Sequence, residues 1–365
     1  MLEKENSSNN QDRIAIKIKQ NLEPVFTELF SELNPTFENL EGIQELMSWY
    51  DKIQNKDDNN EEKIIENIIN ECMKHLPQEY GNLCIENIKI EWGKKLKKIE
   101  SEKGQGITAY FEDGTETKGD LLIGCDGIHS KTRTLMMPDF PSPTYTGTVL
   151  VGGIIDDLMQ TSLAPNTYHM TFGKNLHFGN LFEKLGRKLW WTYVPYPEDS
   201  VKNRTKVSWD EWKKKLLFLL KDEHLTVRKS IEMTKETLLY LPIYNIPHLP
   251  TWHKGHVCLI GDAAHAISPH AGQGATMAIE DAVVLAKCLR DIYDIQDAFS
   301  KYQQLRKDRV EKMISMARRS GGMFTTTNPI GKIVRNAISP FMIKLSTKGF
   351  DEIYGYKVDW DKKIK

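Results

Sequence analysis

Apolar positions recur with two different periods along the first third of this 365-residue chain. Alternating apolar and polar residues predict half-buried strands at 13–18, 88–92 and 107–111. Apolar residues spaced three and four apart predict helices at 24–33 and 64–76, and the second has one face suited to burial. Together these patterns indicate a mixed α/β protein.

The strand predicted at 107–111 is followed by the turn signal Asp113-Gly114 and then by a short apolar strand, "DLLIG", at 120–124. These elements predict an antiparallel meander. The meander feeds the loop "CDGIHSKTR" at 125–133.

From about 143 to 250 the chain is richer in Thr, Tyr, Trp and Val, and strand-like stretches flank one convincing helix at 209–220. This composition predicts an inserted sheet that could cover a ligand. Trp190 and Trp191 are neighbours on one predicted strand, so their side chains face opposite ways and at most one lines a pocket. Core packing is the expected role of the other.

Composition narrows the class of partner. Forty-nine Lys and Arg against 50 Asp and Glu give a formal net charge of −1, so no overall field favours nucleic acid or an anionic membrane. A small-molecule substrate is the expected partner, and oligomeric state is left open. The basic and apolar stretches at 212–221 and 328–345 could lie on a membrane surface, although ordinary amphipathic packing is the favoured explanation.

Cysteine usage and the start of the chain bear on the compartment. The five cysteines are widely spaced, form no CxxC pair and lie mostly on apolar faces, so we expect buried thiols of a reducing compartment. The first 12 residues are polar and are expected to be disordered, and no stretch has the length and apolarity of a membrane span. A cytoplasmic protein is therefore predicted. The cysteines are Cys72, Cys84, Cys125, Cys258 and Cys288.

The strongest local signal is "GDAAHAISPHAGQGATMAIEDA" at 261–282, which follows the apolar run 257–260. The run predicts a strand covered on both faces, and Asp262 stands at its carboxyl end, where open α/β sheets bind ligands. Gly272 and Gly274 lie at or just before the start of a helix, where bare backbone N–H groups attract negative charge. Because the turn contains no Lys or Arg, it favours the partly anionic pyrimidine edge of a reduced flavin over a phosphate.

Two other interpretations of this stretch are open. His265, His270 and Asp262 could bind a metal or serve a hydrolase, although the loop lacks helical ligand geometry and no third ligand is evident. Glu280 and Asp281 lie inside the predicted helix, where we expect them to be solvated or to cap a neighbour rather than to act in catalysis.

With these residues in view, the chain resembles the FAD-dependent aromatic-ring hydroxylases and epoxidases, the group that contains para-hydroxybenzoate hydroxylase, zeaxanthin epoxidase and urate hydroxylase. The stretch 261–282 is similar to the family's GD motif and the stretch 120–133 to its DG motif. The resemblance implies an α/β fold in which an FAD-binding Rossmann-like domain, incomplete at its N-terminus, carries an inserted substrate sheet and C-terminal helices. The implied parts are 1–142 and 251–345 for the FAD domain, 143–250 for the substrate sheet and 346–365 for a tail.

The resemblance also implies site residues and chemistry. Asp262 would bind the ribityl chain of FAD, Pro269 would pack near its ring, and Asp126 and Gly127 would lie near the pyrophosphate. NADPH or NADH would reduce the flavin, a flavin C4a-hydroperoxide would form, and oxygen would pass to a small aromatic or unsaturated apolar substrate. No catalytic side chain is named. The implied cofactor-binding residues are Asp126, Gly127, Arg133, Gly261, Asp262, Ala263, Pro269, Gly272, Gln273, Gly274 and Ala275.

One part of the family pattern has no match here. A first strand and a GxGxxG turn, which would hold the FAD pyrophosphate, are expected before the segment that starts near Arg13, and the chain contains neither. We therefore expect an incomplete monooxygenase of this family. The alternatives are a non-catalytic binding protein and an FAD-dependent oxidase or reductase on the same scaffold.

Overall fold

The structure is a computed structural model. It describes residues 15–18, 88–91, 93–101, 106–156, 168–172, 177–182, 187–202, 208–221, 223, 225–235, 239–269, 272–325 and 355–364. The helices expected at 24–33 and 64–76, and the disorder expected at 1–12, lie outside these residues.

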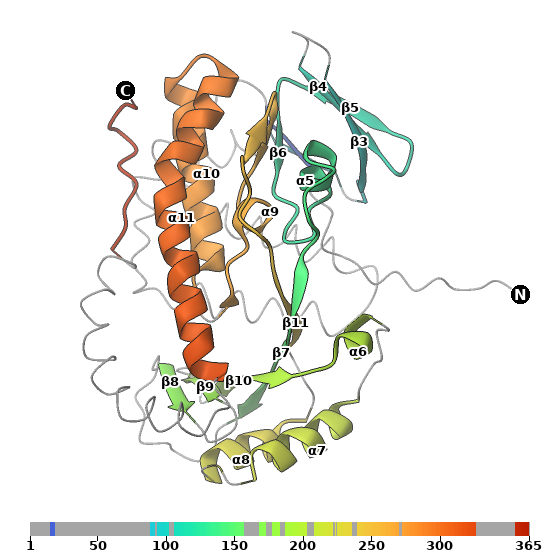
Figure 1. The fold of residues 1–365 in the computed structure, drawn as a ribbon, viewed down its shortest axis with the longest axis vertical. Helices are drawn as coiled ribbons and strands as arrows, with labels where there is room; N and C mark the ends of the chain where they lie inside the picture. Colours follow the sequence, from blue (N-terminus) through green and yellow to red (C-terminus); the bar gives the residue numbers. More distant parts are fainter. Residues whose placement is uncertain are drawn as a thin grey trace, which may run out of the picture.

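A small sheet lies beside the two longest helices (Figure 1). Its strand order is β12 (His253–Lys254), β13 (Val257–Leu259) and β6 (Leu122–Gly124). β13 pairs with β6 in parallel and with β12 antiparallel. All three residues of β13 are buried, as expected for a strand covered on both faces.

Each parallel strand leads through a loop into helix. β6 is followed by α5 (Lys131–Met136), and β13 by α9 (Asp262–His265) and α10 (Gly274–Asp291). α11 (Ile295–Thr325) packs against α10. Side chains from β13, α9, α10 and α11 share one core cluster with Trp252.

Two further antiparallel sheets belong to the first half of the chain. β1 (Ala15–Ile18) pairs with β2 (Ile88–Glu91), and the predicted meander is β3 (Leu96–Ser101), β4 (Ile107–Phe111) and β5 (Glu116–Gly119). On β4 residues 107, 109 and 111 are buried, so the alternation in the sequence marks the core-facing side.

The expected second sheet has the strand order β11-β7-β10-β9-β8 and is antiparallel throughout. Its strands are β7 (Thr144–Asp156), β8 (Tyr168–Phe172), β9 (His177–Phe182), β10 (Arg187–Pro195) and β11 (Leu239–Asn245). In the described part of the chain, three helices lie between β10 and β11: α6 (Glu198–Lys202), α7 (Trp209–Leu219) and α8 (Leu225–Met233). The sequence predicted only α7, because a capping box at Ser208 and Glu211 marks its start and no such signal marks α8.

α7 and α8 cover one face of this sheet, and the unit formed by α9, α10 and α11 lies on the other side of it (Figure 1). The core between the sheet and the helices contains Trp190, Trp212 and Leu216. No helix in the described part of the chain has the length and apolarity needed to cross a bilayer.

The last described residues, 355–364, are held on α10. The guanidinium of Arg290 donates to the carbonyl oxygen of Trp360 at 2.8 Å and lies 4.4 Å from the centre of its ring. The backbone N–H of Ile364 donates to Asp291 at 2.8 Å. This part of the expected tail is therefore packed against the fold.

The cysteine prediction needs one correction. Cys258 and Cys288 are buried, as expected, whereas Cys125 is exposed. Cys125 immediately follows the last residue of β6, in the loop that leaves the sheet, so the apolar strand before it does not carry it into the core. Cys72 and Cys84 lie outside the described residues.

Candidate functional site

The two loops singled out by the sequence meet at one edge of the small sheet. Because β6 and β13 are parallel, their carboxyl ends lie together, and the backbone N–H of Ile260 donates to the carbonyl oxygen of Gly124 at 3.1 Å. The DG loop (125–130) and the GD turn (261–273) both leave from this edge. We treat the two together as the candidate site.

The DG loop is shaped by its own aspartate. The carboxylate of Asp126 accepts hydrogen bonds from the hydroxyl of Ser130 at 2.5 Å and from the N–H and hydroxyl of Thr132 at 2.8 and 3.0 Å. Ser130 in turn caps α5 by accepting from the N–H of Arg133. Asp126 therefore fixes the loop, and Gly127 beside it has a φ of 74° with no atom within 4 Å of where a Cβ would lie.

Arg133 joins the two loops. Its side chain is 3% exposed, and its guanidinium donates to the carbonyl oxygen of Ala263 in the GD turn at 2.9 Å and to that of Ile128 in the DG loop at 2.5 Å. Burial lowers the pKa of Arg133, and the charge of Asp126 opposes that shift. Arg133 thus sets the spacing of the loops, and its hydrogen-bonding N–H groups are directed at protein rather than outward.

Gly261 opens the GD turn in a conformation that requires glycine. Its φ is 56° and its ψ −142°, and a Cβ there would lie 3.0 Å from the Cβ of Ala278 on α10. Its N–H donates to the carboxylate of Asp281 at 2.9 Å. The turn and the helix that follows it are thereby held in close contact.

Asp262, the next residue, is exposed and makes no hydrogen bond within the part of the chain that the structure describes. The surrounding protein still reduces its hydration enough to raise the pKa of its carboxyl above the ordinary 3.8, with the charge of His265 opposing the shift. Its acceptor atoms are therefore free to bind hydroxyl groups of a ligand.

The start of α10 offers the complementary donors. Gly272 has a φ of 61°, and no atom lies within 4 Å of a Cβ built at Gly272 or at Gly274. Ala275 is exposed, while the N–H of Gly272 donates to the carbonyl oxygen of Pro269 at 3.0 Å. Open space therefore adjoins the first residues of an 18-residue helix, where N–H groups point along the helix axis away from any internal partner.

The buried side-chain amide of Gln273 is the feature of this site that most specifically indicates a ligand. Its side chain is 1% exposed, yet among the described residues neither its amide nitrogen nor its amide oxygen has a hydrogen-bond partner. Leaving a buried polar group unpaired costs about 1–3 kcal/mol. A ligand with both a donor and an acceptor at the start of α10 would satisfy this amide.

Behind the turn lies a buried charge network that the sequence did not predict. Asp281 is fully buried and accepts from His265 at 2.5 Å and from the Nε of Arg306 at 2.8 Å, in addition to Gly261. Glu280 binds Arg306 and Arg309 at 2.7 and 2.6 Å. The expectation that Glu280 and Asp281 are solvated was wrong, whereas the alternative that they cap a neighbour holds for Asp281.

The pKa of Asp281 shows how this network is balanced. Burial alone would raise it, but the hydrogen bonds and positive charges of His265 and Arg306 outweigh burial and hold it below the ordinary 3.8. Arg306 belongs to α11. Its partners lie 25 residues away on α10, beyond the reach of any local pattern.

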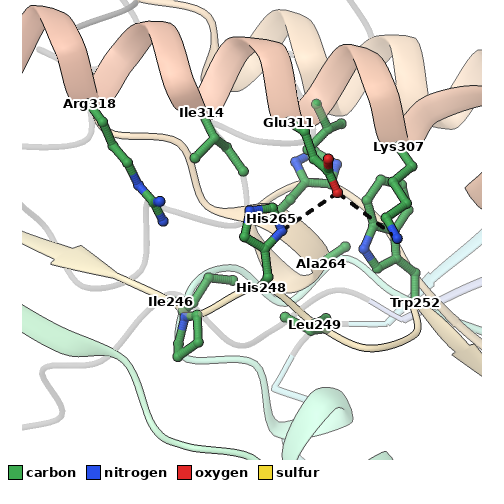
Figure 2. A pocket seen from close by; sticks show the side chains of 12 residues that line it. Ile246, His248, Leu249, Trp252, Ala264, His265, Lys307, Glu311, Ile314 and Arg318 are labelled. Atoms are coloured by element: carbon green, nitrogen blue, oxygen red, sulfur yellow. Dashed lines mark ion pairs between the residues drawn. The ribbon is translucent and has the colours of Figure 1, made fainter.

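A cavity of about 20 Å³, enough for one water molecule, lies on the α11 side of the GD turn (Figure 2). Figure 2 shows His248 and Lys307 directed at Glu311, with nitrogen to oxygen distances of 3.9 and 4.0 Å. Neither Asp262 nor any glycine of the two motifs lines it, so it is separate from the open space beside those glycines. His265 lines this cavity, and its buried Nδ1 has no hydrogen-bond partner among the described residues.

The metal interpretation finds no support in this geometry. His265 is bound to Asp281, and His270 lies outside the described residues. Within the residues that the structure does describe, no three His, Cys, Asp or Glu side chains are grouped so as to hold an ion.

Two strand-to-helix loops meet at one sheet edge, and one of them, the GD turn, carries both the carboxylate of Asp262 and the amide of Gln273, for which the described residues provide no hydrogen-bond partner. This arrangement defines an α/β protein that binds a flat, polar cofactor. Residues 83–317 match the model of the FAD binding domain family, and the chain belongs to that family. This confirms the family, the α/β fold and FAD as the cofactor that the motifs predicted.

Individual known proteins are also similar to this chain, in agreement with the family assignment. The chain is 32% identical over 232 residues to the FAD-dependent urate hydroxylase of Klebsiella pneumoniae, which covers 63% of this chain and 58% of that protein. It is 31% identical over 239 residues to the chloroplastic zeaxanthin epoxidase of an Oncidium hybrid, covering 62% and 35% of the two chains. Among solved structures, Klebsiella pneumoniae HpxO complexed with FAD and uric acid is 26% identical with a TM-score of 0.58, covering 73% of this chain and 63% of that one.

The chain thus spans less than two thirds of the length of these relatives. The matched part includes both the DG loop and the GD turn.

Proposed function

We propose that the protein is an FAD-dependent monooxygenase that uses NADPH or NADH and hydroxylates or epoxidises a small aromatic or unsaturated apolar substrate. The observation that carries the proposal is a pair of polar groups at the GD turn that have no hydrogen-bond partner among the described residues, the carboxylate of Asp262 and the amide of Gln273. A flavin presents both ribityl hydroxyls and a pyrimidine edge with donors and acceptors, which is the complement of these two groups.

Different residues of the site would bind different parts of FAD. Asp262 would accept hydrogen bonds from ribityl hydroxyls, while Gln273 and the free N–H groups of Gly274 and Ala275 would bind the pyrimidine edge. Pro269 would pack near the ring. When bound, the flavin would supply hydride acceptance from a nicotinamide and activation of oxygen.

The other side chains support the site from behind. Arg133 would keep the DG loop and the GD turn at a fixed spacing, and Asp281 would hold Gly261 in its left-handed conformation. Such supporting hydrogen bonds are what keep binding groups in productive geometry. The five-stranded sheet would cover the reacting ring and exclude water from it.

The first experiment is to purify the full chain and titrate it with FAD while recording the visible absorption spectrum. A perturbed, saturable flavin spectrum is expected. Asp262→Ala should weaken FAD binding by about 10- to 100-fold, because it removes charge-assisted hydrogen bonds. Asp308→Ala, which changes an exposed aspartate on α11, is the matched control and should bind FAD as the wild type does.

The reaction is then tested with NADPH or NADH under labelled oxygen and a panel of aromatic and unsaturated compounds. Incorporation of one labelled oxygen atom into a product supports the monooxygenase. Nicotinamide oxidation without incorporation would indicate an oxidase or reductase, and a protein that remains colourless with FAD would contradict the proposal and indicate a binding protein.

We also propose a location, a class of partner and a division into domains for this protein. The widely spaced cysteines, none of them in a CxxC pair, support a reducing, cytoplasmic location. A small molecule is the proposed partner, and the near-neutral formal charge of −1 argues against nucleic acid. The division into an FAD domain (1–142 and 251–345) and a substrate sheet (143–250) is also a proposal.

A further inference from the structure

We propose that Tyr356 is a positioning residue for the cofactor site: its ring holds Arg306 and Arg309 in the geometry that fixes the GD turn. Tyr356 belongs to the 355–364 segment, which runs beside α10 and α11 (Figure 1). The effect of Tyr356 on FAD rests on the proposed function. Its effect on the turn does not, because the turn can be measured in the protein without FAD.

One aromatic ring faces both arginines. The ring centre of Tyr356 lies 4.0 Å from the guanidinium carbon of Arg309 and 5.6 Å from that of Arg306. A cation within about 6 Å of an aromatic face is attracted by the ring, and more strongly where water is excluded. Arg306 is fully buried and the side chain of Arg309 is 12% exposed, so solvent screens little of this attraction.

The two arginines bind two adjacent acids of α10. Arg309 donates from Nε and Nη2 to the two carboxylate oxygens of Glu280, at 2.7 and 2.6 Å. Arg306 bridges both acids, because its Nη1 lies 2.7 Å from Glu280 and its Nε donates to Asp281 at 2.8 Å. This fork requires both planar guanidinium groups to keep one orientation, and a ring packed against them restricts them to it.

The network ends at the backbone of the GD turn. Asp281 accepts from the N–H of Gly261 at 2.9 Å, and Gly261 opens the turn that carries Asp262. If Arg306 moved away, the buried carboxylate of Asp281 would lose a positive partner and its hold on Gly261 would weaken. Tyr356 therefore acts on the turn through the arginines, across an ion pair and a hydrogen bond.

The segment that carries Tyr356 is itself packed against the fold. Trp360 is 4% exposed and binds the last turn of α10, as described above. The carbonyl oxygen of Asp359 accepts from Lys287 of α10, and Val358 packs against the core cluster that contains β13. Because the segment is already fixed, the ring loses little further freedom on meeting the two guanidinium groups.

Hydrogen exchange of the FAD-free full chain, followed by mass spectrometry, measures the effect on the turn. In Tyr356→Leu the peptide that covers 259–266 should exchange about three- to tenfold faster than in wild type, because the Gly261 anchor opens more often. Peptides of α7 should keep the wild-type rate. Tyr356→Phe retains the ring and should stay within about twofold of wild type. Lys357→Ala, which changes the exposed neighbouring residue, is the matched control.

A double-mutant cycle tests the route through the arginines. If Tyr356 acts through Arg309, Tyr356→Leu should add little to the exchange rate of the turn once Arg309→Met is present. Effects that multiply independently would overturn the proposal. Should the double variant fail to fold, the comparison of Tyr356→Leu with Tyr356→Phe decides alone.

A second control separates positioning from a general loss of stability. Ile231→Ala removes a fully buried side chain from the core under α8, which contains none of the residues of the arginine network. It should lower the urea midpoint and leave the exchange rate of the turn unchanged. A turn that opens as readily in Ile231→Ala as in Tyr356→Leu would overturn the proposal.

Titration of the same variants with FAD measures the effect on the cofactor. Tyr356→Leu should bind FAD about three- to tenfold more weakly, and the visible circular dichroism of bound FAD at saturation should change. Tyr356→Phe and Lys357→Ala should match wild type in both measurements. Faster exchange of the turn in Tyr356→Leu with unchanged FAD affinity and circular dichroism would overturn the role of Tyr356 in cofactor binding.

The outcomes distinguish this inference from the proposed function. Unchanged exchange of the turn in Tyr356→Leu overturns the positioning role even if FAD binds and oxygen is incorporated. Faster exchange in Tyr356→Leu, retained protection in Tyr356→Phe and no FAD binding by the wild type support the positioning of the turn, while the proposed function fails by its own titration.

Discussion

Asp281 is the side chain whose removal should most clearly weaken the site. It is fully buried and accepts hydrogen bonds from Gly261, His265 and Arg306 at 2.9, 2.5 and 2.8 Å. In Asp281→Asn the volume is kept but the charge is lost, so Glu280 is the one anionic partner that Arg306 retains among the described residues. Removing one partner of a buried ion pair costs about 3–5 kcal/mol, which we expect here at the lower end because the amide keeps one acceptor.

The free energy of unfolding is measured by urea denaturation followed by tryptophan fluorescence at pH 7. A loss of about 3 kcal/mol would be a large part of the roughly 5–15 kcal/mol of a typical protein. The matched control is Glu311→Gln, a half-exposed carboxylate on α11 with ion pairs of 3.9 and 4.0 Å. Such surface pairs contribute about 0–1 kcal/mol, so the control should change little.

A double-mutant cycle tests the cause. If the cost comes from leaving Arg306 with too little negative charge, Asp281→Asn combined with Arg306→Met should cost less than the sum of the two single changes. A loss of under about 1 kcal/mol in Asp281→Asn, or strict additivity in the double variant, would refute the reasoning. In the folded variant FAD affinity should also fall, because Gly261 loses its anchor.

Three further predictions follow from the same contacts. Gly261→Ala should cost about 1–3 kcal/mol in urea denaturation and more than Gly255→Ala, because both have positive φ but only position 261 lacks room for a Cβ. Arg133→Met should lower stability by about 2–4 kcal/mol and weaken FAD binding in the spectral titration, with Arg133→Lys intermediate; unchanged FAD affinity would contradict its role as a link between the loops. Since the pKa of Asp281 is below 3.8 in the folded protein, its contribution is present above about pH 4 and is lost as pH falls through the folded value. Urea midpoints should therefore drop more steeply between pH 5 and 3 in wild type than in Asp281→Asn, and parallel curves would show that another group controls acid stability.

The sequence by itself determined the local elements of the site. Continuous apolar residues marked β13, alternation marked β4, and helical spacing after Gly274 marked α10, because burial imposes these periods on any strand or helix that faces a core. The two motifs were sufficient to predict the family and FAD, since the glycines and Asp262 are themselves the groups that a cofactor contacts.

Only the tertiary structure decided how distant residues combine. The link from Arg133 to Ala263 spans 130 residues, and the pairing of β6 with β13 spans a similar length of chain. The burial of Asp281 depends on its ion pair with Arg306 of another helix. The sequence pattern of α10 alone therefore could not predict that this charged residue is buried. The same holds for the two tryptophans of β10. Alternation shows that they face opposite ways, but the side on which α7 and α8 pack decides which one is buried in the core and which one is only partly buried on the opposite face.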